Sequence, residues 1–202
     1  HEDHTGNAAN IKQYCNIPVY SNELCKQIVN RRFRIPAVQK LLWGTAWAVD
    51  TKLLNDRFVS NNGVDLDIVL TPGHTDDMSC FYDKENGFLF TGDLYIASKV
   101  RYLHKDEDLS EQLSSLNKVL TLDFETAFCP HRGIMKNGKE NLTKKRDFII
   151  DLASQVQELS IKGLSSKQIQ RKLLGREGVL TLASNFDFSK KGLIEGCLKL
   201  SL

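Results

Sequence analysis

The chain has 202 residues, 41% of them hydrophobic, which is enough to bury a core in one domain or in one domain with a small appendage. Its 27 basic and 25 acidic residues nearly cancel, so the whole molecule lacks the positive field that steers proteins onto nucleic acid. The sequence contains no apolar run of the roughly 18 residues that a membrane helix needs, and its five cysteines form no CxxC pair. These features argue against a membrane-spanning segment and a disulfide framework, and they favour reduced thiols in the cytoplasm.

Strands and helices are predicted to alternate in the first quarter of the chain. Residues 7–14 have helical composition, residues 17–21 are typical of a short strand, and residues 22–30 predict a helix capped by Ser21. The segment from Arg31 to Thr51 contains tryptophans and glycine, and we expect a long functional loop there.

The central region gives clearer signals. Residues 64–70 alternate apolar and polar side chains as a half-buried strand does, and the pattern breaks at Thr71-Pro72-Gly73, directly before His74. Two short strands around the polar turn 84–87 predict a hairpin that ends at Asp93. A leucine-striped helix is expected over residues 106–122, followed by a strand over 124–130 that ends at His131.

The composition changes after Asn141, where three helical stretches follow one another. They cover residues 142–161, 164–175 and 189–200, and serines are available as N-caps for the last two. We therefore expect two domains: an α+β domain over residues 1–143 and a small helical domain over residues 144–202.

Histidines and aspartates fall at turns and strand ends, where a rigid scaffold presents reactive groups. The candidates are His1, Asp3, His4, His74, Asp93 and His131. A single histidine after a strand is usually a surface residue, and a terminal "HEDH" alone is usually solvated. Their joint placement favours metal ligands, because imidazole and carboxylate suit zinc as well as iron or manganese. A terminal histidine that binds copper through its amine and ring is an alternative, but it leaves Asp93 unexplained.

Four motifs in order, "HEDHTG", "TPGHT", "FTGDLY" and "CPHRG", resemble the successive motifs of the metallo-beta-lactamase superfamily, whose opening signature is HxHxDH. The resemblance covers roughly residues 1 to 140. It implies an αββα sandwich, with the N-terminal strands missing from this chain, followed by the C-terminal helices as a small winged-helix-like domain. It also implies a hydrolase with a binuclear site holding two metal ions, by default Zn²⁺, with Fe or Mn as alternatives, and it implies no organic cofactor.

The ligand roles are carried over from the family residue by residue. By similarity, His1 and His74 bind the first metal and Asp93 bridges both. Asp3, His4 and His131 bind the second metal. The first histidine of the family signature has no counterpart in this sequence, so we expect the natural protein to extend upstream of His1 by about 50 residues, the length of a few strands. A signal peptide in such a segment would not be visible here.

A second departure is "CPHRG", where many relatives have a glycine before the histidine. Arg132 places a cation beside His131, where it either meets an anionic substrate or is solvated. Thr5 and Thr75 are candidates for hydrogen bonds that hold the ligands in place.

The resemblance implies hydrolysis by a metal-activated water, with Asp3 as the catalytic residue that orients the water or passes a proton to the leaving group. Because the superfamily has many activities, the substrate stays open. A small-molecule ester, thioester or lactone is the first option. A phosphodiesterase or ribonuclease whose C-terminal domain contacts nucleic acid is the second, and a catalytically inactive metal-binding module is the third. No membrane partner is expected, and the oligomeric state is not predicted.

Overall fold

The computed structural model describes residues 1–31, 45–184 and 186–201. These residues form two compact units, His1–Val64 and Asp65–Leu202, and each unit is described by itself. Most of the loop predicted over residues 31–51, including Phe33 and Trp43, lies outside the described residues.

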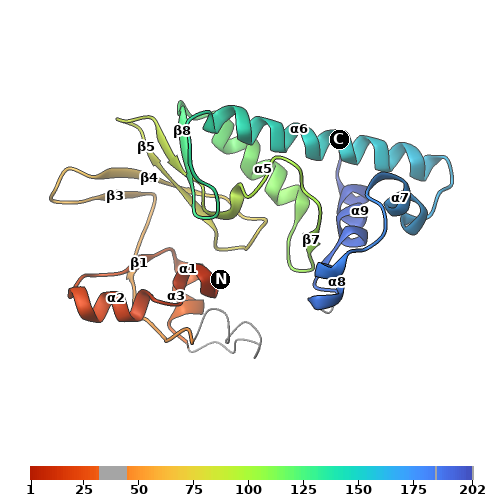
Figure 1. The fold of residues 1–202 in the computed structure, drawn as a ribbon. Helices are drawn as coiled ribbons and strands as arrows, with labels where there is room; N and C mark the ends of the chain where they lie inside the picture. The colour runs from red at the N-terminus through yellow and green to blue at the C-terminus, as the bar shows by residue number, and fades with distance from the viewer. Residues whose placement is uncertain (32–44, 185, 202) are drawn as a thin grey trace. The chain divides into compact units, whose positions relative to one another are not determined.

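The first unit contains short helices and strands, shown in red to orange in Figure 1. Its elements are α1 (Glu2–Thr5), α2 (Ala8–Cys15), β1 (Tyr20–Ser21), α3 (Glu23–Val29), β2 (Lys52–Leu53) and β3 (Arg57–Val59). Strand β1 pairs with β2 in parallel. The predicted helices over residues 7–14 and 22–30 are confirmed as α2 and α3.

The predicted cap of α3 is wrong by one residue. The side chain of Asn22 accepts a hydrogen bond from the Cys25 backbone N–H at 2.8 Å and so caps the helix. Ser21 belongs to β1, and its hydroxyl lies 2.6 Å from the Thr51 hydroxyl. The hydroxyl that we predicted to cap the helix therefore contacts Thr51 instead.

The second unit is built on a mixed sheet whose strands follow the order β4-β5-β6-β8-β9 within this unit. The strands are β4 (Asp65–Leu70), β5 (Ser79–Asp83), β6 (Phe88–Phe90), β8 (Thr126–Cys129) and β9 (Gly133–Met135). The predicted hairpin is confirmed as β5 and β6, which pair antiparallel. Strand β6 pairs with β8 in parallel, so both strands end at the same edge of the sheet.

One face of this sheet is covered by α5 (Leu109–Leu120) and α6 (Gly138–Ile161), as Figure 1 shows. Cys80, Leu89 and Ala127 point to this face and are fully buried. They belong to one core with Leu116 of α5 and Ile149 of α6. The Asp108 side chain caps α5 by accepting from the next backbone N–H groups, so the helix begins close to its predicted place.

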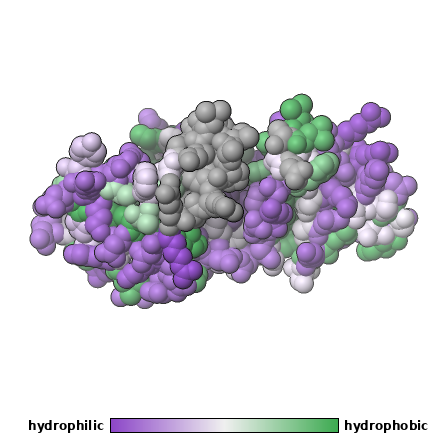
Figure 2. All heavy atoms as spheres, turned by 90° about the horizontal axis from the view of Figure 1, so that it is seen from below, coloured by the Kyte–Doolittle hydropathy of each residue, from purple (hydrophilic) through white to green (hydrophobic). Residues whose placement is uncertain are grey.

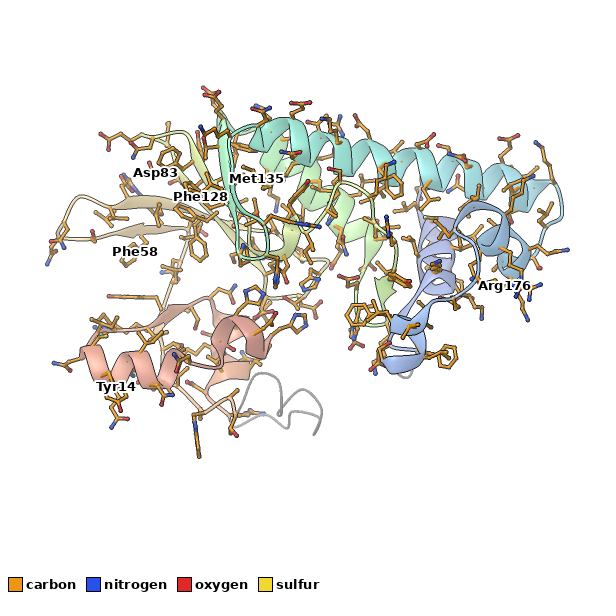
Figure 3. The ribbon with its side chains drawn as sticks, viewed as in Figure 1. Tyr14, Phe58, Asp83, Phe128, Met135 and Arg176 are labelled. Carbon is orange, nitrogen blue, oxygen red and sulfur yellow. The ribbon has the colours of Figure 1, made fainter. Side chains whose placement is uncertain are left out.

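Aromatic side chains occupy the other face of the sheet. Phe81 is the register partner of Phe90, and Phe90 is the register partner of Phe128. The Phe90 and Phe128 rings stack with centroids 4.8 Å apart, and both rings line a hollow of about 480 Å³ together with Leu66. Side chains alternate between the two faces of the sheet along each strand. Phe128 and Met135, both labelled in Figure 3, belong to opposite faces: Met135 is buried on the helix-covered face, and Phe128 lies on the aromatic face.

The C-terminal part of the second unit is mainly helical, as predicted. Its elements are α7 (Ser166–Leu173), α8 (Val179–Ala183), β10 (Phe188–Ser189) and α9 (Lys190–Lys199). Helix α9 packs on α6 and α7, and α7 begins with a capping box of Ser165 and Gln168. The predicted domain boundary at 143/144 falls inside α6, and the separate helical domain stays a prediction.

Helix α8 was not among the predicted helices, and it carries exposed apolar side chains. Val179 and Leu182 are 83% and 68% exposed, and hydrophobic residues gather over this region in Figure 2. None of the helices in the described ranges has both the length and the apolar character that a bilayer crossing requires.

Candidate metal centre

His74 follows β4 on a turn that packs against the start of α5. Gly73 has a φ of +122°, and a Cβ at this position would lie 2.3 Å from the Gln112 backbone nitrogen. The Asp108 N–H donates to the Gly73 carbonyl at 2.8 Å, and the Ser115 hydroxyl donates to the Pro72 carbonyl at 2.8 Å. The turn therefore needs glycine, and helix α5 fixes the position from which His74 projects.

Asp93 lies in the short 3₁₀ helix η1 (Gly92–Leu94), which begins directly after β6, and its side chain is 7% exposed. The buried Lys145 of α6 donates from Nζ to the Leu94 carbonyl at 2.8 Å. The Cys129 thiol donates to the Tyr95 carbonyl at 2.9 Å. Two buried side chains from other elements thus hold the backbone that follows Asp93.

The three strand ends bring His74, Asp93 and His131 together. His131 follows β8, and the parallel pairing of β6 with β8 places it beside Asp93. His74 Nε2 lies 3.3 Å from Asp93 Oδ2, and His131 Nε2 lies 3.2 Å from Asp93 Oδ1. One buried carboxylate therefore presents each of its oxygens to a different imidazole.

This donor set fits divalent cations. Ligand atoms about 2.1 Å from a tetrahedral zinc ion are roughly 3.4 Å apart, which is close to both nitrogen–oxygen separations at Asp93. A carboxylate with two oxygens can bind one cation through each, and imidazole with carboxylate is a set that zinc, iron and manganese accept. His74, Asp93 and His131 thus fit divalent cations chemically, and their role as ligands of a binuclear site stays a prediction.

His74 has a carboxylate at each ring nitrogen, because its Nδ1 lies 2.5 Å from Glu107 Oε1. Burial by itself lowers the pKa of His74, but hydrogen bonds to Asp93 and Glu107 and the charges of both carboxylates raise this pKa to about 9. In the metal-free protein the His74 ring is therefore protonated at neutral pH.

Glu107 is a residue that sequence reasoning missed. Its second oxygen accepts from the His104 backbone N–H at 2.9 Å, and its side chain is 12% exposed. In the sequence Glu107 is one of three successive acidic residues, 106–108, that precede α5. Acidic residues at this position are usually explained by the start of a helix. The ring of His104 packs on Phe188 with centroids 4.7 Å apart.

The remaining predicted ligands, His1, Asp3 and His4, belong to the first unit and lie in or next to α1. His4 Nε2 lies 3.6 Å from Asp3 Oδ2. The Thr5 hydroxyl donates to the His1 carbonyl at 3.0 Å, so this threonine holds the terminal turn. Their role as ligands, and the catalytic role of Asp3, stay predictions.

Arg132, which follows His131, is anchored to the backbone. Its Nε donates to the Ile96 carbonyl at 2.6 Å, and the residue is exposed. This hydrogen bond orients the guanidinium, and its contact with an anionic substrate stays a prediction.

An α+β fold that gathers two histidines and a shared buried carboxylate at its strand ends offers a donor set that suits a divalent metal. The model of the metallo-beta-lactamase superfamily matches residues 1–131, and the chain belongs to that superfamily. Members of this family bind divalent metals, and the membership makes the chain an enzyme, a hydrolase of the metallo-beta-lactamase fold.

Several solved structures share this fold. A metallo-beta-lactamase family protein from Thermus thermophilus superposes with a TM-score of 0.69 at 18% identity over 98% of this chain and 71% of that chain. A beta-lactamase domain protein from Burkholderia ambifaria has a TM-score of 0.69 at 13% identity over 97% of this chain and 64% of that chain. TTHA1623, solved in a di-iron-bound form, has a TM-score of 0.54 at 25% identity over 69% of this chain and 70% of that chain.

Two sequence relatives differ in how much of their length is matched. An uncharacterized protein of Aquifex aeolicus is 25% identical in an alignment 156 positions long that covers 68% of this chain and 74% of that protein. An atrochrysone carboxyl ACP thioesterase of Aspergillus fumigatus is 27% identical over 95 residues, which are 47% of this chain and 29% of the thioesterase.

Proposed function

We propose that this chain is a metal-dependent hydrolase that acts on a small ester, thioester or lactone. The observation that carries the proposal is the pair of imidazoles, His74 and His131, facing the two oxygens of Asp93 at 3.3 and 3.2 Å. This arrangement is what a bridging carboxylate between two cation sites requires. Bound divalent cations would supply a water with a pKa near 7 and would polarise the substrate oxygen.

The residues of this chain then have distinct tasks. Asp93 serves both cation positions, because each of its oxygens faces a different histidine. His1 and His74 belong to the first position, and His4, Asp3 and His131 belong to the second. Asp3 also orients the attacking water or passes a proton to the leaving group. Zn²⁺ is the metal that we propose for both positions, because histidine and carboxylate oxygen are among its usual ligands.

The thioesterase relative supports an acyl substrate, although the similarity covers 95 residues of this chain. Hydrolysis of a thioester, an ester or a lactone needs the same two elements, an activated water and a polarised carbonyl. The substrate that we propose is therefore a small acyl compound. The compartment that we propose is the cytoplasm.

A phosphodiesterase or ribonuclease activity is the second candidate, and the surface of α7 favours it. Lys167, Arg171 and Lys172 of this helix are exposed, and Arg176 follows on the same segment, as labelled in Figure 3. Clustered cations of this kind bind phosphates in a salt-dependent manner. A solvated helix surface explains the same residues without any nucleic acid.

A substrate panel separates these candidates. Protein of measured metal content would be assayed with a thioester, a lactone, a generic phosphodiester and single-stranded RNA. We expect turnover of the thioester or the lactone. Turnover of RNA, with binding that weakens as salt rises, would favour the second candidate. Stoichiometric metal without turnover of any substrate would favour an inactive metal-binding module.

A further inference from the structure

Glu107 joins the candidate metal centre to the C-terminal part of the second unit. One carboxylate oxygen lies 2.5 Å from His74 Nδ1, and the other accepts from the His104 backbone N–H at 2.9 Å. Both oxygens are therefore engaged, one by a proposed metal ligand and one by the backbone of β7 (Leu103–His104).

Strand β7 is in turn held by the end of the chain. It pairs antiparallel with β10, so that His104 is the register partner of Phe188. The His104 ring packs on the Phe188 ring, and the Lys105 N–H donates to the Asp187 carbonyl at 2.9 Å. Contacts from residues 187–189 thus fix the segment that carries Glu107.

The role of Glu107 follows from the contact that the other ring nitrogen of His74, Nε2, makes. His74 Nε2 faces Asp93, so this nitrogen is the one available to a cation at that carboxylate. Nδ1 must then carry the proton, and a carboxylate is the strongest acceptor that a side chain offers for it. Because Glu107 is largely buried, water competes weakly for the same hydrogen bond.

We propose that Glu107 is a positioning residue that fixes the ring orientation and the tautomer of His74, and that β10 keeps Glu107 in place. The inference rests on the proposed function, since it assumes that His74 binds a cation through Nε2. A carboxylate behind a metal-bound histidine raises the basicity of the ring, and loss of such a partner typically costs 10- to 100-fold in metal affinity. Residues 187–189 thereby gain a role in positioning a proposed metal ligand.

The first test compares E107A and E107Q with the unmodified chain and with the matched control E111Q, which alters an exposed glutamate of α5. Zn²⁺ affinity would be measured by competition with a chromophoric chelator, and the His74 tautomer by ¹⁵N NMR of its ring nitrogens. We expect E107A to weaken binding by about 10- to 100-fold and E107Q to weaken it less, because the amide oxygen still accepts a hydrogen bond.

The NMR signal separates positioning from a general structural effect. In the unmodified chain with Zn²⁺ we expect a proton on Nδ1, and in E107A we expect this resonance to shift or to broaden by exchange. A folded E107A protein, as judged by circular dichroism, with unchanged affinity and an unchanged Nδ1 resonance would overturn the inference. If the unmodified chain itself binds no Zn²⁺, the proposed function fails instead, so the two failures are distinguishable.

A second variant tests the contribution of β10. F188A removes the ring that packs on His104. It alters neither partner of the hydrogen bond between His74 and Glu107. We expect F188A to weaken Zn²⁺ binding less than E107A does, and the double variant to lose no more than E107A alone, because both changes act through one carboxylate. Additive losses would contradict the role of β10.

Discussion

The two groups of proposed ligands are held by different kinds of contact. His74 and Asp93 project from backbone that α5 and α6 fix through Ser115 and Lys145, far away in the sequence. In α1, the His1 carbonyl accepts from the backbone of His4 and from both the backbone and the hydroxyl of Thr5, all within one turn. Long-range contacts thus fix the backbone of the first group, whereas these hydrogen bonds to the His1 carbonyl lie within one turn.

Three of the four motifs thus belong to one unit, and the fourth belongs to the other. The turn motif "TPGHT" and the strand-end motifs "FTGDLY" and "CPHRG" meet within one unit, through strand pairing and helix packing. The motif "HEDHTG" forms a short helix of its own. The following predictions test this difference.

Loss of Asp93 should have the largest effect, because this carboxylate faces both histidines. We expect D93A to lose both metal binding and turnover. Metal content by mass spectrometry and activity on the panel substrate would measure these losses, with D67A on β4 as a control that keeps both. Stoichiometric metal and full activity in D93A would refute the assignment.

Single histidine substitutions should separate the two groups. We expect H131A to reduce the bound metal from two ions to one, and H4A to do the same if the N-terminal segment supplies ligands to the same position. Metal-to-protein ratios measured after dialysis decide between the outcomes. An H4A protein that keeps two ions while H131A keeps one would restrict the ligand set to the second unit.

The pH dependence of metal binding should report the proton on His74. Since its pKa is raised from 6.5 to about 9 in the metal-free fold, a metal ion must displace this proton at neutral pH. We expect the apparent Zn²⁺ affinity to rise by about tenfold per pH unit up to about pH 9. Calorimetry in buffers of different ionisation enthalpy would count the released protons, and pH-independent binding would contradict the coupling.

The same raised pKa has a consequence for stability. The proton on His74 stabilises the metal-free fold fully below pH 6.5, and this contribution is lost as the pH rises through about 9. Denaturant unfolding of chelator-treated protein across this range would measure the decline, and H74Q should remove it. A decline of the same size in H74Q would assign the effect to another group.

The smallest effects should come from two matched hydroxyls that support the backbone beside a ligand. Ser115 is 1% exposed and donates to the Pro72 carbonyl, so S115A should cost about 1–3 kcal/mol of unfolding free energy by leaving that part-buried carbonyl without the bond. Thr5 makes the corresponding bond to His1 in a local turn, and T5A should cost no more than about 0.5 kcal/mol. Equal losses would show that α1 is as firmly held as the turn at His74.

The order of the elements and the candidate ligands could be predicted from the sequence because they depend on local patterns. The alternation in β4, the glycine-bearing turn between β5 and β6, and the leucine stripe of α5 are local patterns, and each follows from backbone geometry. Glu107 and Lys145 were missed because an acid before a helix and a lysine within one are usually explained by capping and by solvation. Their importance depends on contacts that only the fold creates.

By itself the sequence determined the superfamily, the strand ends that carry His74, Asp93 and His131, and the helical character of the C-terminal region. These features are set by residue type and spacing along the chain. Only the tertiary structure decided that Asp93 offers one oxygen to each histidine, that Glu107 lies behind His74, and that β10 anchors the strand beside it. The reason is physical: parallel pairing of β6 with β8 and packing of α5 against Gly73 bring together residues whose separation in the sequence contains no information about their distance in space.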